Sequence, residues 1–446
     1  MFKRWLFLIG IILISTKNYS QNTVIPDTNF EQALIDLGYD TPPLNNQIPT
    51  NNIIGVTDLD IKDKNIQDLT GLEDFIALSN LDCSGNLLTN LNVTTLSNLK
   101  ILWCFNNLLT NLNVNQNSNL TALRCENNTI SNLNLMNNTS LVDLACENNM
   151  ISNLNVTNNL SLSRFQCDSN LLSSLDVSNN SNLSYLSCSD NEIAELNVVN
   201  NNALKVLRCS NNQIRILNLS QNNVLSDLDC SNNQLCQLLV NNGNNNNVTD
   251  LNFSNNPDLN CVVVDNSDGN HSTWLPNSFS NYVSSNEACS SFIPVDILDD
   301  FTGKIYILPV INNGNYFTQS RGNGQLLNNG DTITNTQTIY IYNEINCYSN
   351  ESNFNVVITD KDFLIPEFFT PNNDGFNDVW IVFDYSNSIN NVSIFNRHGK
   401  LLKFLNGNSL KWDGTFNGVL MNTDSYWYEI VLNSREVLRG YFALKR

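Results

Sequence analysis

Eight cysteines recur at one fixed interval, and this spacing constrains the fold more than any other feature of the 446-residue chain. Each lies 21 residues after the one before: Cys83, Cys104, Cys125, Cys146, Cys167, Cys188, Cys209 and Cys230. A strict period of this length indicates stacked repeats, each of which buries its apolar face against its neighbours. Three roles are open to the cysteines: a disulfide framework, a metal array, or one position of the stack.

Other residue types keep the same phase. Leucine stands five residues before each of these cysteines, asparagine three after and leucine eight after, so the unit reads LxxLxCxxNxLxxLxVxxNxx. Side chains alternate between core and solvent along a strand, which places the cysteine inward as a small apolar group. The Cβ vectors of stacked residues run parallel instead of converging on a disulfide, and no histidine completes a zinc site in the repeats. We therefore expect a structural ladder of buried thiols.

The unit resembles the leucine-rich repeat family, whose strand motif is LxxLxLxxN with leucine or cysteine in the third apolar place. The resemblance covers roughly residues 58–261 and implies a curved solenoid of parallel strands, which is predicted as a domain over residues 58–265. About ten residues must make each return, so extended or 3₁₀ segments are expected opposite the strands. Phe30, Leu34 and Leu37 fall on one face of a short helical pattern, and residues 21–57 are predicted to cap the first repeat.

A second cap, over residues 266–290, is expected to close the stack. Cys261 and Cys289 lie outside the ladder, and in an oxidising compartment they are the predicted disulfide. The sequence leaves the pairing of Cys236 and Cys347 open.

The N-terminus and the net charge bear on location and partners. Residues 1–20 have the basic start and short apolar core of a secretory signal peptide. That apolar run is too short to span a bilayer and no later segment approaches 18 apolar residues, so no transmembrane anchor is expected. A formal net charge of −20 repels phosphate backbones, which argues against a nucleic-acid partner.

Beyond residue 290 the repeat gives way to alternating apolar strands and turns. Residues 291–360 predict a small β spacer domain, similar to the immunoglobulin-like modules of large Bacteroidetes surface proteins. The blocks "IPEFFTPNNDGFNDVW", "VSIFNRHGKLL" and "RGYFALKR" lie within residues 361–446. They resemble the gliding-motility-associated C-terminal domain, the type B sorting signal of the type IX secretion system. The resemblance implies export by that machinery to the cell exterior or outer surface of one of the Bacteroidetes.

The predicted fold class is therefore mainly β. A leucine-rich repeat solenoid of 21-residue repeats with parallel strands comes first, and immunoglobulin-like β-sandwich domains follow it.

Few side chains suggest metal binding or catalysis. A weak calcium candidate gathers four oxygen-bearing side chains, but it lacks the regular acidic alternation and closing glutamate of an EF-hand, and a polar turn is favoured: Asn372, Asp374, Asn377 and Asp378. Glu126 and Glu147 could form a glycosidase pair, yet on adjacent repeats they are interpreted as a solvated face. No cofactor is expected, and the chain is predicted not to be an enzyme. The alternative is an extracellular, glycan-active hydrolase with an unrecognised site.

Recognition through the outward strand positions is the predicted function. These positions lie three before, one before and one after each cysteine, and they supply the predicted binding residues: Trp103, Phe105, Arg124, Glu126, Asp143, Glu147, Arg164, Asp168, Tyr185 and Arg208. Aromatic and arginine side chains dominate binding energy at interfaces. The alternative is that loops or a neighbouring strand cover Trp103 and Phe105. We predict a secreted recognition or adhesion protein that binds a protein or a glycan.

Overall fold

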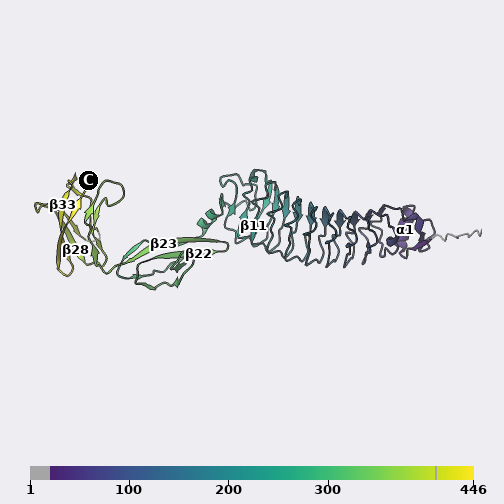
Figure 1. The fold of residues 1–446 in the computed structure, drawn as a ribbon, viewed down its shortest axis with the longest axis horizontal. Helices are drawn as coiled ribbons and strands as arrows, with labels where there is room; N and C mark the ends of the chain where they lie inside the picture. The colour runs from purple at the N-terminus through teal and green to yellow at the C-terminus, as the bar shows by residue number, and fades with distance from the viewer. Residues whose placement is uncertain (1–20, 407–408) are drawn as a thin grey trace, which may run out of the picture. The chain divides into compact units, whose positions relative to one another are not determined.

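A computed structural model describes residues 21–406 and 409–446, and the chain divides into two compact units between Phe292 and Ile293. The first unit holds the solenoid, and the second consists of β-sheets (Figure 1). The predicted signal peptide, residues 1–20, lies outside the described residues.

One parallel sheet follows the solenoid from turn to turn, with a three-residue strand in each turn (Figure 1). Each strand pairs in register with the strand of the next turn, as Leu81 with Leu102 and Leu102 with Leu123. The predicted parallel solenoid of leucine-rich repeats is confirmed. In chain order its strands are β3 (Asp58–Asp60), β4 (Asn80–Asp82), β5 (Ile101–Trp103), β6 (Ala122–Arg124), β7 (Asp143–Ala145), β8 (Arg164–Gln166), β9 (Tyr185–Ser187), β10 (Val206–Arg208), β12 (Asp227–Asp229) and β14 (Asp250–Asn252).

The core of the solenoid is a continuous stack of leucine and cysteine. The central leucine of a strand, such as Leu102, and the cysteine that follows it, such as Cys104, are fully buried. Parallel pairing continues past the strand, because the Cys104 N–H donates to the Arg124 carbonyl at 2.8 Å. Burying one leucine stabilises the fold by about 1.5–3 kcal/mol. Each turn therefore owes most of its stability to the apolar surface that it buries against the next turn.

A left-handed backbone position turns the chain after each strand. The residue two after each ladder cysteine has φ between 52° and 65°: Gly85, Asn106, Asn127, Asn148, Ser169, Asp190, Asn211 and Asn232. Glycine, asparagine and aspartate tolerate this conformation better than other residues do. The turn aims the next asparagine inward, where its side chain bonds neighbouring backbone groups. The paired asparagines of the repeat therefore have separate roles.

The return side of the solenoid is built from extended segments and short turns. Across residues 58–292, all of which the structure describes, there is no α-helix, as the repeat length predicted. A second parallel sheet forms only towards the C-terminal end of this unit. Its strands are β11 (Ile216–Asn218), β13 (Gln237–Leu239), β15 (Val262–Val263) and β16 (Tyr282–Val283), and the 3₁₀ turns of residues 58–292 are η2 (Leu72–Asp74), η3 (Asn245–Asn247) and η4 (Glu287–Phe292).

A short helix caps the first turns. The Asp27 side chain accepts from the backbone N–H groups of the first helical turn, as an N-cap does, and Phe30 and Leu34 are fully buried. The predicted position of Leu37 on the same face is wrong, because the helix ends one residue earlier and Gly38 turns the chain away, which leaves Leu37 44% exposed. The elements here are β1 (Asn22–Val24), α1 (Thr28–Asp36), β2 (Gln47–Pro49) and η1 (Thr50–Asn52).

The C-terminal end of the solenoid is tied by a disulfide. Cys261 and Cys289 are bonded, with their Cα atoms 5.8 Å apart. Trp274 is buried in the same region and packs against His271, with ring centroids 4.4 Å apart. A cross-link and a buried aromatic group together stabilise an end that has no further repeat to cover it.

The second unit is rich in β-sheet. One five-stranded sheet comprises β17 (Phe301–Gly303), β23 (Tyr348–Ile358), β22 (Gln337–Ile345), β19 (Asn315–Phe317) and β20 (Leu326–Leu327). A second comprises β25 (Phe368–Phe369), β34 (Val437–Leu444), β33 (Asp424–Leu432), β28 (Ile389–Phe395) and β29 (Leu401–Asn406). Short strand pairs are β18 (Tyr306–Ile307) with β21 (Thr332–Ile333), β24 (Phe363–Leu364) with β27 (Phe383–Asp384), β26 (Trp380–Ile381) with β30 (Lys411–Trp412), and β31 (Thr415–Phe416) with β32 (Val419–Leu420).

Most strand pairs of this unit are antiparallel, so the mainly β prediction for the C-terminal third is confirmed. The immunoglobulin-like assignment of residues 291–360 stays a prediction. Aromatic packing dominates the core around the second sheet, where Trp380 stacks on Phe442 with ring centroids 4.0 Å apart. None of the described helices is long and apolar enough to cross a membrane.

Candidate functional site

The outward positions of the parallel sheet form one continuous surface. We call it the strand face: the first and third residues of β3–β10, β12 and β14, with the residue after the buried position that follows each strand. All ten predicted binding residues lie on it and are partly exposed, Trp103 most clearly at 36%. Because the strands are in register, the side chains form three rows with one member from each turn.

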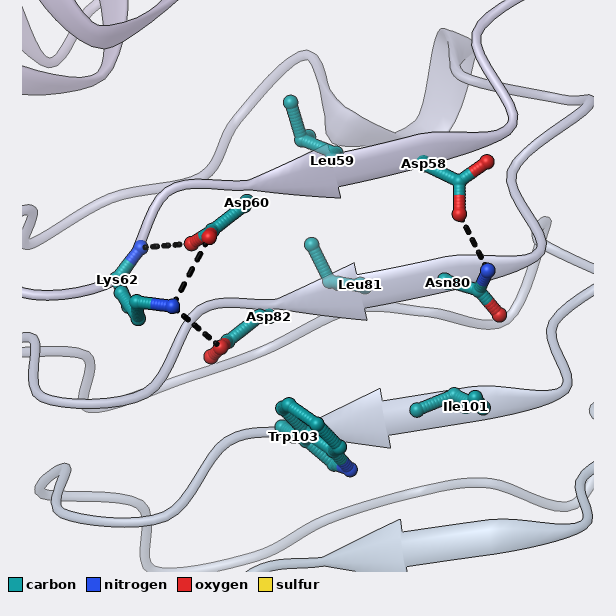
Figure 2. A pocket seen from close by; sticks show the side chains of 9 residues that line it. All are labelled: Asp58, Leu59, Asp60, Lys62, Asn80, Leu81, Asp82, Ile101 and Trp103. Atoms are coloured by element: carbon teal, nitrogen blue, oxygen red, sulfur yellow. Dashed lines mark hydrogen bonds and ion pairs between the residues drawn. The ribbon is translucent and has the colours of Figure 1, made fainter.

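A pocket of about 280 Å³ lies at the N-terminal end of the strand face, over β3, β4 and β5 (Figure 2). We call it the Trp103 pocket. Its outward lining comes from all three rows: Asp60, Asp82 and Trp103 at one end of the strands, Asp58, Asn80 and Ile101 at the other, and Lys62 from the third row. Leu59 and Leu81 complete the lining. The pocket therefore combines an indole ring with carboxylates and an amide.

Ion pairs and hydrogen bonds organise the polar end of this pocket. The Lys62 ammonium lies 3.0 Å from an Asp60 carboxylate oxygen and 3.7 Å from one of Asp82, and these contacts raise the pKa of Lys62 (Figure 2). At the other end the Asn80 amide donates to Asp58, which lowers the pKa of Asp58. The carboxylates of Asp60 and Asp82 are therefore both already paired with the Lys62 ammonium group.

The arginines of the strand face are likewise held by neighbours. Arg208 forms an ion pair with Asp227 at 2.7 Å, and Arg164 lies over Tyr185 with its guanidinium carbon 4.1 Å from the ring centroid. Arg124 is 3.6 Å from Asp143, and its guanidinium lies 6.0 Å from the centroid of Trp103. Such contacts stiffen long side chains, which lowers the entropy that a ligand must remove on binding.

A column of three carboxyl groups crosses the middle of the strand face. The interpretation of Glu126 and Glu147 as a solvated face is wrong: each has a carboxylate oxygen that is enclosed and has no hydrogen-bond partner among the described residues. Burial raises the pKa of Glu147 to about 7, and it also raises the pKa values of Glu126 and Asp168. Gln166 donates to Glu147 at 2.6 Å, and Ser187 donates to Asp168 at 2.6 Å. The column is therefore partly protected from water.

The weak calcium candidate is a hydrogen-bonded turn. The Asp378 carboxylate accepts from the backbone N–H groups of Asn372 and Gly375 at 3.0 and 2.8 Å. The Asp374 carboxylate accepts from the Phe376 N–H at 2.8 Å and from the Asn372 amide at 2.7 Å. Asn377 contributes its backbone, as its carbonyl accepts from the Thr370 N–H. Within the described residues there is no group of three acidic, histidine or cysteine side chains placed to hold a metal ion.

The ladder cysteines have the environment of core residues. All eight are fully buried free thiols: Cys83, Cys104, Cys125, Cys146, Cys167, Cys188, Cys209 and Cys230. Burial raises the pKa of these thiols far above the usual range, as for Cys146, so the reactive thiolate is strongly disfavoured. The row of thiols therefore stabilises the solenoid by packing in its core.

Several residues of the Trp103 pocket escaped sequence reasoning. Asp58, Asp60 and Lys62 belong to a degenerate turn with Ile61 in place of the cysteine, and Asn80 and Asp82 belong to the first turn of the ladder. The phase of Leu59 and Ile61 already placed that strand in register. Applying the outward-position rule to it would have found these side chains.

Comparisons with known proteins bear on both units. Residues 363–444 match the family described as the CHU_C type IX secretion signal domain. A search of curated proteins found no match. Similar solved structures include the functional domain of InlJ from Listeria monocytogenes, described as including a cysteine ladder, at 20% identity over 76% of this chain and 99% of that chain, with a TM-score of 0.40. The internalin InlF of the same organism is similar at 20% identity, over 54% and 82%, with a TM-score of 0.43.

The class of protein now follows. The in-register strands and buried ladders define a leucine-rich repeat solenoid, and the C-terminal match defines a type IX secretion signal domain. The chain is a secreted repeat protein that is exported to the cell exterior or surface.

Proposed function

We propose that this secreted protein recognises an extracellular protein or glycan through its strand face and has no enzymatic activity. The observation that carries the proposal is Trp103, an indole ring that lines the pocket at the N-terminal end of a regular sheet. Tryptophan is among the side chains that contribute most to binding energy at interfaces, because it offers a large apolar ring together with an N–H donor. The remaining predicted binding residues extend the same surface across six turns.

The geometry of the strand face supports recognition by many contacts at once. Successive turns are about 4.8 Å apart, so each row presents a side chain at a regular interval. The sheet is held by backbone hydrogen bonds and a continuous core, and its arginines are paired. A surface ordered before binding loses little entropy when a partner docks, which favours affinity.

The other segments have proposed roles in presentation and export. Residues 21–57 and 266–290 cap the solenoid of residues 58–265, and residues 291–360 act as an immunoglobulin-like β spacer. Residues 361–446 engage the type IX secretion machinery, with residues 1–20 as the signal peptide. We propose an adhesion or recognition protein that is presented outside the cell.

Partner capture tests the proposal. The exported chain with Trp103→Ala and Phe105→Ala together should capture much less of its extracellular partner than the unchanged chain does. The matched control is Met136→Ala with Leu160→Ala, which removes two exposed apolar side chains from the return segments. Equal losses in the two double variants would contradict recognition by the strand face, as would a loss of binding that tracks a loss of stability.

One observation favours a second candidate, an extracellular glycan hydrolase. The pKa of Glu147 is raised to about 7 beside a second carboxyl group, Glu126, and a raised carboxyl pKa is what a general acid requires. Incubation with soluble polysaccharides tests this function. Turnover that is abolished in both Glu126→Gln and Glu147→Gln would replace the recognition proposal by the hydrolase.

A further inference from the structure

The strand face is strongly acidic. Its positions carry ten acidic and four basic side chains, a formal net charge of −6: Asp58, Asp60, Asp82, Glu126, Asp143, Glu147, Asp168, Asp227, Asp229 and Asp250 against Lys62, Arg124, Arg164 and Arg208. Because the pKa of Glu147 is raised to about 7, this side chain carries only part of its formal charge near neutral pH. The whole chain has a net charge of −20. A surface of one sign attracts a ligand of the opposite sign and raises its association rate.

The four cations of the strand face already have partners within the chain. Lys62 contacts two carboxylates, and the arginines contact carboxylates or aromatic rings. Several carboxylates, by contrast, form no ion pair with the described residues, among them Asp58, Asp229 and Asp250. The strand face can therefore bind further cationic groups of a ligand, whereas few of its own cations are left to bind anionic groups.

The Trp103 pocket concentrates the groups that bind a cation. Asp82 and Trp103 are direct neighbours in the strand register, so a carboxylate and an indole ring stand side by side (Figure 2). A cation over an indole ring gains about 0.5–1 kcal/mol at an exposed site and more where water is excluded. The Lys62 ammonium, bound to Asp60 and Asp82, shows that this end of the pocket accepts an ammonium group.

The size of the pocket limits what enters it. At about 280 Å³ it lies just below the range of about 300–1,000 Å³ typical of small-molecule sites. It is suited to one side chain or one sugar ring. A neutral sugar could stack on the indole and donate hydrogen bonds from its hydroxyl groups to the carboxylates. A guanidinium or ammonium group can make both kinds of contact, and it alone adds the attraction between opposite charges.

We propose that the Trp103 pocket is the subsite for an arginine or lysine side chain of a basic protein partner, held between the Trp103 ring and the Asp82 carboxylate. The proposal rests on the function proposed above and adds the chemistry of the partner. The rest of the basic partner lies along the acidic strand face. Lys62 competes with the incoming side chain for Asp82, so it lowers the affinity and acts as an internal occupant of the site.

Lys62 provides the sharpest test, because its removal should strengthen binding, and a misfolded variant would not bind more tightly. The probe is a peptide of alternating arginine and glycine, titrated into the exported chain by calorimetry. Lys62→Gln should raise the affinity several-fold. The control is Lys205→Gln, which makes the same change in net charge at an exposed lysine off the strand face and should alter the affinity little. Equal gains in affinity in both variants would overturn the proposed site, because they would reflect only electrostatic attraction to the acidic chain as a whole.

Loss-of-binding variants complete the design. Trp103→Ala and Asp82→Asn should each weaken the arginine peptide by about tenfold, while Asp250→Asn at the far end of the face should have a small effect. A peptide with citrulline in place of arginine keeps the shape without the charge and should not bind. Citrulline binding as tight as that of arginine would overturn the proposal.

The outcome also separates this inference from the proposed function. If neutral oligosaccharides bind with dependence on Trp103 while the arginine peptide does not, the basic-partner inference fails and strand-face recognition stands. If neither probe binds but capture of the extracellular partner still requires Trp103, the basic-partner inference again fails, while recognition by the strand face stands.

Discussion

Replacing Asn149 by alanine should destabilise the solenoid strongly, because this side chain links its own turn to the preceding one. Its Nδ2 group donates to the Cys125 carbonyl at 3.0 Å and the Cys146 carbonyl at 3.1 Å. Its Oδ1 atom accepts from the Ile130 N–H at 2.9 Å. The same arrangement recurs in each turn of the ladder, so Asn149 represents the whole row.

The expected magnitude follows from which groups lose their partners. The two cysteine carbonyls keep a second donor each, Asn128 for Cys125 and Asn170 for Cys146. The buried Ile130 N–H keeps none among the described residues. An orphaned buried donor costs about 1–3 kcal/mol and each of the two weakened bonds about 0.5–1.5 kcal/mol, so Asn149→Ala should cost about 2–6 kcal/mol.

Asn159 is the matched control, because it belongs to another row of fully buried asparagines, on the return side: Asn117, Asn138, Asn159, Asn180, Asn201 and Asn222. Its Nδ2 group donates to the Leu135 and Asn138 carbonyls at 3.2 and 2.8 Å, and both carbonyls also accept a backbone N–H. Its Oδ1 atom is buried and has no partner among the described residues. Asn159→Ala leaves no donor orphaned and removes an unsatisfied oxygen, so it should cost about 1 kcal/mol or less.

Thiol labelling along a urea titration measures the change in the free energy of unfolding in both variants, and it reports on the solenoid alone. The ladder cysteines are buried and their thiol pKa values are raised, so they react only after the solenoid opens. The midpoint for the Cys146 peptide should fall markedly in Asn149→Ala and only slightly in Asn159→Ala. Equal shifts in the two variants would show that the unpaired Ile130 N–H does not determine the loss of stability.

Three further predictions concern protonation, packing and export. Burial raises the pKa of Glu147 from 4.5 to about 7, so the folded state binds this proton more tightly, and the stability it contributes is lost as the pH rises through that interval. Glu147→Gln should therefore flatten the pH dependence of unfolding, whereas Glu192→Gln, at an exposed position, should not. Cys146→Ser should cost about 1–3 kcal/mol in the same urea assay, because it buries a hydroxyl in an apolar row. A chain that lacks residues 361–446 should remain folded in the periplasm, and protease accessibility at the surface of intact cells checks this; full exposure of the truncated chain would contradict the sorting role.

Much of the solenoid could be predicted because its determinants are local and repeated. The period of 21 residues fixes the length of a turn, and the alternation around Leu102 and Cys104 decides which side chains face inward. The end of α1 was harder to predict. The apolar spacing places Leu37 on the helical face, but the chain leaves the helix before Leu37 and turns at the left-handed Gly38. A pattern of apolar residues does not show where a helix ends.

The candidate site was less predictable, since it depends on stacking between turns. The strand register brings Asp82 beside Trp103, although 20 residues separate them along the chain. The enclosure of one Glu147 oxygen likewise depends on neighbours from adjacent turns, such as Gln166. Local sequence identifies outward positions, and only the three-dimensional stack determines how much water reaches them.

Hydrogen exchange of the exported chain, with and without its captured partner, tests recognition by the strand face most directly. Slower exchange is expected in peptides that contain β4, β5 and β6, centred on Trp103, with no change in the return-side strand β11. Protection confined to the return segments or to residues 293–446, with β4–β6 unchanged, would contradict recognition by the strand face.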